Sequence, residues 1–75
     1  MIKKDIKPIL SWAIANGEAK IIDRISMKLL PQFIKHNYKI TEQKILESDT
    51  LEVSIEVYDL VKNMAEELVG SSYSG

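Results

Sequence analysis

The side chains of this 75-residue sequence that are best suited to chemistry are four cations at helical spacing: Lys20, Arg24, Lys28 and Lys35. On a helix that turns by about 100° per residue, they fall within an arc of roughly 80°. Such a stripe can contact phosphate groups, so nucleic-acid binding is one hypothesis for function. It ranks second, because residues that read base edges are sparse on this face and a pI near 5.7 is low for a DNA-binding domain.

Side chains suited to catalysis or metal binding are few. The sequence contains no cysteine, and His36 is its single histidine. We expect His36 to lie near the end of a helix, where a cation suits the negative pole, rather than to act as a base. The glycines are isolated from one another, so no phosphate-binding loop is present, and no acidic group shows metal-ligand spacing. The sequence therefore predicts a non-enzymatic protein without cofactor or metal.

Charge is divided unevenly along the chain, although the net charge is only -1. Residues 1–40 contain eight basic and three acidic residues, a balance of +5, whereas residues 41–75 contain two basic and eight acidic residues, a balance of −6. Opposite charges on the two halves favour pairing, within one chain or between chains. The acidic half also allows a further hypothesis, an inhibitor that docks into a basic groove of a nucleic-acid enzyme in place of phosphates.

The element that must carry most of these carboxylates is the stretch 51–69. On a helix its polar residues share an arc of about 140°, and almost all the remaining positions are apolar. We expect Asp49 to cap this helix, with Glu52 completing a capping box, and Gly70 to end it. The alternative is a strand, because residues 51–57 alternate with period two and are rich in β-branched side chains. That reading gives a hairpin near residues 43–57 followed by a shorter helix.

Two further helices precede this stretch. The first runs from Asp5, its expected N-cap, to Asn16 and ends at Gly17. The second runs from residue 18 to about 37 and is kinked or broken at Pro31, because proline removes a backbone hydrogen bond. A short helix over residues 42–47 is expected before the final one. Met27 and Met64 are expected to fill gaps between the helices.

The sequence therefore predicts an all-α bundle of three to four helices in one domain, residues 1–70, followed by a disordered tail, residues 71–75. A chain this short buries little surface, and the apolar arc of the last helix is too wide for one neighbour to cover. We therefore expect a protein interaction module that works as a homodimer or higher oligomer. The expected interface consists of Leu51, Ile55, Val57, Tyr58, Val61, Met64 and Leu68.

Location and origin follow from composition alone. No apolar run approaches the roughly 20 residues of a membrane span, and the N-terminus does not resemble a signal peptide, so we expect a cytoplasmic protein that does not bind membranes. The richness in isoleucine, lysine and glutamate is typical of proteins from low-GC bacteria and their phages.

Overall fold

The protein is mostly helical, with a small two-stranded antiparallel sheet. Its structure is a computed structural model that describes residues 2–29, 47 and 49–74. The elements of the described ranges, in chain order, are β1 (Lys3–Asp5), α1 (Lys7–Ala15), α2 (Lys20–Arg24), the π-helix η1 (Ile25–Leu29), β2 (Glu52–Ser54) and α5 (Ile55–Val69).

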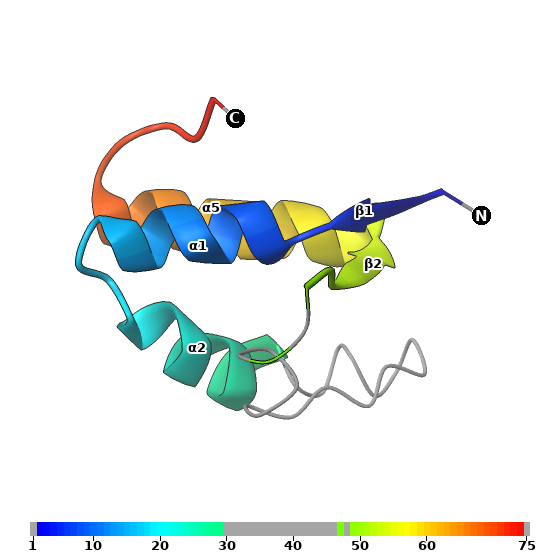
Figure 1. The fold of residues 1–75 in the computed structure, drawn as a ribbon, viewed down its shortest axis with the longest axis horizontal. Coiled ribbons are helices and arrows are strands. Elements are labelled where there is room, and N and C mark those ends of the chain that lie inside the picture. Colours follow the sequence, from blue (N-terminus) through cyan, green and yellow to red (C-terminus); the bar gives the residue numbers. More distant parts are fainter. Residues whose placement is uncertain (1, 30–46, 48, 75) are drawn as a thin grey trace.

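Figure 1 shows how these elements are arranged. Helices α1 and α5 pack against each other and run in the same direction along the long axis of the molecule. The two strands lie at the end of this pair where both helices begin, and α2 and η1 lie along one side of the pair. The all-α expectation is therefore too simple, because residues 3–5 and 52–54 are strands.

The sheet joins two segments that are distant in the sequence. Its register pairs Lys3 with Ser54, Lys4 with Val53 and Asp5 with Glu52. The expected helix over 51–69 is thus wrong for residues 52–54, where the strand alternative was correct. That alternative placed the partner strand just before residue 51, whereas the partner is the N-terminal segment. Alternation puts Val53 in the core and leaves Glu52 exposed.

Helix α1 matches the expectation closely at its end and less closely at its start. Pro8 lies in the first turn, where a missing N–H costs no helical hydrogen bond. After the helix, Gly17 adopts a φ of 83°, and its N–H donates to the carbonyl of Ile14 at 2.9 Å. The N–H of Glu18 donates to the carbonyl of Ala13 at 2.9 Å, which completes a Schellman motif.

The expected cap Asp5 has a different role. It belongs to β1, and the N-cap position of α1 is Ile6. Its Oδ1 accepts the N–H of Lys7 at 2.9 Å and the N–H of Leu51 at 2.7 Å. The N–H of Ile6 donates to the carbonyl of Leu51 at 2.9 Å. Asp5 therefore ties the start of α1 to the segment that enters β2, which a purely local cap would not do.

The second predicted helix is only partly described. Residues 20–24 form a regular α-helix, and residues 25–29 continue it as a π-helix, which the sequence did not indicate. The hydroxyl of Ser26 donates to the carbonyl of Ile22 at 3.1 Å at this transition. The expected break at Pro31 lies outside the described residues, as does the short helix expected at 42–47 except for Glu47.

Helix α5 begins at Ile55 with Ser54 as its N-cap. The Ser54 hydroxyl accepts the N–H of Val57 at 3.3 Å, so the expected cap by Asp49 is wrong. The helix ends as predicted, because Gly70 has a φ of 82° and its N–H donates to the carbonyl of Glu66 at 2.8 Å.

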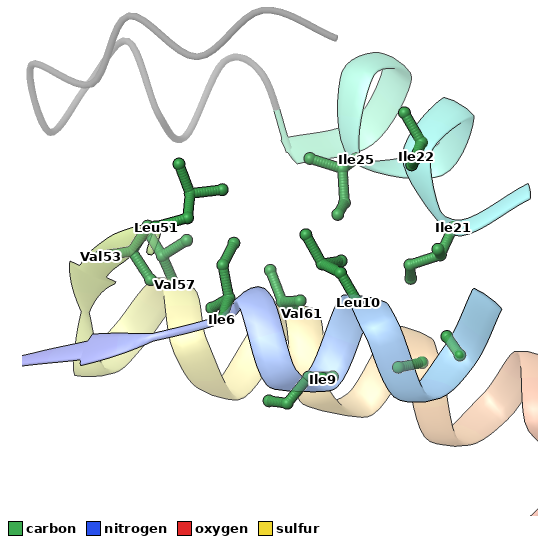
Figure 2. Packing of buried hydrophobic residues seen from close by; sticks show 12 residues of the cluster. Ile6, Ile9, Leu10, Ile21, Ile22, Ile25, Leu51, Val53, Val57 and Val61 are labelled. Carbon is green, nitrogen blue, oxygen red and sulfur yellow. The ribbon is translucent and has the colours of Figure 1, made fainter. Parts of the chain in front are cut away.

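The core lies where α1, α2, η1, β2 and α5 meet. Figure 2 shows Ile21 and Ile25 directed from α2 and η1 towards Leu10 of α1 and Val61 of α5. Isoleucine, leucine, valine and alanine alone make up the buried set, which contains no polar or charged side chain among the described residues. The members are Ile6, Ile9, Leu10, Ala13, Ile21, Ile22, Ile25, Leu51, Val53, Val57, Val61 and Ala65.

The segment after α5 returns to the helix pair. Tyr73, in the segment 71–75 that the sequence predicted to be disordered, is half-buried and packs against the core. Its ring centroid lies 5.1 Å from that of Trp12 with the planes inclined at 58°, and its N–H donates to Glu66 Oε2 at 2.8 Å. Tyr73 is therefore held by an aromatic contact and a hydrogen bond.

Candidate functional site

The outer surface of α2 and η1 carries three of the four cations that the sequence placed on one stripe. Lys20 and Lys28 are exposed and Arg24 is half-exposed. All three border one surface hollow of about 370 Å³, together with Asp23 and Met27. The fourth predicted cation, Lys35, lies outside the described residues. We call the surface formed by Lys20, Asp23, Arg24, Met27 and Lys28 the basic hollow.

The apolar half of the same segment positions the basic hollow. Ile21, Ile22 and Ile25 are buried in the core, which turns the intervening side chains outward. Lys20, Arg24 and Lys28 follow one another at intervals of four residues, so they stand above one another on the helical surface. The packing of these isoleucines thus positions the stripe.

Met27 is the apolar residue in the lining of the basic hollow. Its side chain is 81% exposed, the most exposed of the large apolar side chains in the described ranges. The sequence predicted Met27 as a filler between helices, which is wrong, because this residue lies on the side opposite Ile21 and Ile25. A flexible thioether surrounded by cations is suited to contact with an apolar group that carries acidic neighbours.

The predicted oligomer interface does not form one open surface. Leu51, Val57 and Val61 are buried in the core of the chain itself. Tyr58, Met64 and Leu68 are partly buried and pack against the same core, and only Ile55 is exposed. The reason is geometric: α1 covers α5 on one side, and α2 with η1 covers it on another. The cover that was expected from a second chain is supplied by the first 29 residues.

The outer surface of α5 is acidic, as the sequence predicted. Asp59, Asn63 and Glu67 are exposed and follow one another at intervals of four residues, and Leu60 beside them is 37% exposed. We call the surface formed by Asp59, Leu60, Asn63 and Glu67 the acidic stripe. It lies on the side of α5 opposite the buried Val57, Val61 and Ala65.

The start of α5 carries one further contact of a charged side chain. Lys4 of β1 places its Nζ 4.7 Å from the centre of the Tyr58 ring. This cation–π contact links the sheet to α5 and covers part of the Tyr58 ring, which the sequence had placed in an oligomer interface.

Other kinds of site have little support in the described part of the chain. Across residues 2–29, 47 and 49–74, no group of three or more His, Cys, Asp or Glu side chains is arranged to hold a metal ion. Within the same ranges no helix has the length and apolar character needed to cross a membrane. His36 lies outside them.

Sequence reasoning found the cations of the basic hollow but missed two of its members. Asp23 and Met27 are both at positions that the helical period turns outward, so the period itself was the available signal. Met27 was assigned to the core because of its residue type instead.

Comparison with known proteins adds no relative: no family model, curated protein sequence or solved structure matches this chain.

Proposed function

We propose that this protein is a non-enzymatic interaction module that binds an acidic protein partner through the basic hollow. The observation that carries the proposal is the position of Met27, an exposed apolar side chain bordered by Lys20, Arg24 and Lys28 around one hollow. Arginine and methionine are enriched in protein–protein interfaces relative to the rest of the surface. Cations at the rim favour acidic partners and raise the rate of encounter.

Nucleic acid is the second candidate, favoured by the four-residue spacing of Lys20, Arg24 and Lys28 along one surface. Two members of the basic hollow argue against it. The Asp23 carboxylate repels phosphate, and Met27 offers a phosphate backbone no hydrogen bond. Both side chains are compatible with a protein partner that presents a carboxylate, a hydrogen-bond donor and an apolar residue together.

Two variants of the basic hollow separate these candidates. Met27→Ser removes the apolar side chain of the hollow and keeps every charge, whereas Lys20→Gln with Lys28→Gln removes two charges and keeps Met27. Lys62→Gln on α5 is the control for a lost cation outside the hollow. Each protein is titrated by fluorescence anisotropy against a synthetic acidic peptide with one leucine flanked by glutamates, and against a DNA duplex.

For a protein-binding module, both hollow variants weaken binding of the peptide and Lys62→Gln does not. For a nucleic-acid-binding protein, only the loss of the cations weakens binding of the duplex, and its affinity falls steeply with salt. A wild-type protein that binds neither probe at low ionic strength would refute both candidates.

A further inference from the structure

We infer that the acidic partner is a second copy of this chain, whose acidic stripe on α5 occupies the basic hollow. This inference rests on the proposed function and names the partner. It differs from the interface that the sequence predicted, because most residues of that interface lie in or pack against the chain's own core.

The two surfaces match in the arrangement of their charges. In the basic hollow, Lys20 and Lys28 are eight residues apart with Arg24 midway between them. In the acidic stripe, Asp59 and Glu67 are eight residues apart, which spans about 12 Å on an α-helix. Asn63 lies midway and offers both a donor and an acceptor. Each carboxylate of one copy can thus face a cation of the other.

The two surfaces also match in their apolar groups. Met27 is 81% exposed between the cations of the hollow, and Leu60 is 37% exposed beside the carboxylates of the stripe. Contact between these two side chains would remove both from water, which pairing of charges alone would not do. A protein interface of this kind has an apolar centre and a polar rim.

The basic hollow and the acidic stripe of one molecule cannot contact each other. Ile21 and Ile25 of α2 and η1 pack towards the same core as Val61 of α5, so the two charged surfaces face away from each other. A second copy that places its acidic stripe in the basic hollow leaves its own hollow open. Such a head-to-tail contact uses two different patches, so it builds chains or rings rather than a two-fold dimer.

The contact is expected to be weak and sensitive to salt. The hollow occupies only ten residues of helix, α2 and η1, so the buried area falls in the class of small transient interfaces. The charges are at the surface and are screened over about 8 Å at physiological ionic strength and about 3 Å in 1 M salt. Assembly should therefore appear at high protein concentration and low salt.

The test uses two neutralised variants and their mixture. The hollow variant carries Arg24→Gln and Lys28→Gln, and the stripe variant carries Asp59→Asn and Glu67→Gln. Circular dichroism and the urea midpoint check that both remain folded. If the loss of half-exposed Arg24 lowers stability, Lys20→Gln with Lys28→Gln replaces that pair, because both side chains are exposed. Sedimentation velocity is then recorded for each protein over a concentration series.

The expected result is specific. Wild type grows into species larger than a dimer as its concentration rises, and 1 M NaCl reverses this. Each variant alone stays a monomer. An equal mixture of the two variants forms a species that stops at the mass of two chains, because the mixture contains one intact hollow and one intact stripe per pair. Asn16→Ala, on neither surface, is the control and assembles like wild type.

Three results would overturn the inference. Wild type that stays monomeric at all concentrations and salts shows that a second copy is not the partner. Variants that assemble as wild type does show that other surfaces are in contact. A mixture that remains monomeric shows that the hollow and the stripe do not meet. The acidic peptide distinguishes failure of this inference from failure of the proposed function. If the peptide still binds the hollow while self-assembly is absent, only the choice of a second copy as the partner is wrong.

Discussion

The junction at the start of α1 and α5 differs from the outer surface of α2 and η1 in almost every physical respect. At the junction, two strands from distant parts of the sequence are paired, and Asp5 accepts the backbone N–H groups of Lys7 and Leu51. On α2 and η1, the outward side chains are charged, exposed and arranged around a hollow. The difference teaches that the packed junction and the proposed binding surface lie in separate regions, so substitutions can test stability and binding separately.

The largest effect is expected from truncating a core side chain of the helix pair. Leu10 of α1 is buried where α1 meets α2 and α5. Leu10→Ala should therefore lower the free energy of unfolding by about 2–5 kcal/mol. A domain of this size has about 3–5 kcal/mol in total, so the variant should be largely unfolded at room temperature. Urea denaturation followed by circular dichroism measures this.

The comparison is sharpened by Met27→Ala in the basic hollow, which should change the unfolding free energy by no more than about 0.5 kcal/mol, because the side chain is exposed. Equal losses of stability in Leu10→Ala and Met27→Ala would contradict the separation of the two regions.

The next effect concerns the two hydrogen bonds of Asp5. Asp5→Ala leaves the N–H groups of Lys7 and Leu51 without their acceptor and should cost about 1–3 kcal/mol. Asp5→Asn keeps an oxygen at the same position and should recover part of this loss. Thermal unfolding of both variants measures the difference. If Asp5→Ala is as stable as wild type, the junction does not depend on this side chain.

A smaller effect distinguishes the observed cap of α5 from the one expected by sequence. Ser54→Ala removes the hydroxyl that accepts the N–H of Val57 and should cost about 1 kcal/mol. Asp49 is exposed and lies five residues before Ser54, the N-cap of α5, so Asp49→Ala should be close to neutral. Urea midpoints of the two variants are compared. The reverse order would favour a helix that begins near residue 51.

An effect of similar size is expected at the C-terminal end. Tyr73→Ala removes the ring beside Trp12 and should cost about 0.5–1.5 kcal/mol. Because Trp12 is the only tryptophan, its fluorescence reports the change directly. An emission spectrum identical to wild type would show that this segment does not pack on α1 in solution.

Much of the helical structure could be predicted from local signals. Pro8 near the start of α1, Gly17 after its end and Gly70 after α5 act through the backbone of their own neighbours, so one sequence suffices to find them. The outward position of Lys20, Arg24 and Lys28 followed from helical period alone.

The sheet could not be found in this way, because its partners are far apart in the sequence. The alternation around Val53 was visible, but the strand Lys3–Asp5 is only three residues long and has no alternating apolar pattern. The second bond of Asp5, to the N–H of Leu51, likewise depends on the tertiary fold. The same limit explains why the burial of Leu51, Val57 and Val61 within the chain was not expected, because no local signal shows that α1 and α2 cover α5 from two sides.

The central claim is that α5 is covered by its own chain. It is tested most directly by the urea midpoint of the wild-type protein in 1 M NaCl at two protein concentrations about 100-fold apart. A self-covered α5 predicts the same midpoint at both concentrations. A fold that needs a second chain would gain about 2.7 kcal/mol of apparent stability at the higher concentration, and the rise in midpoint would contradict the account.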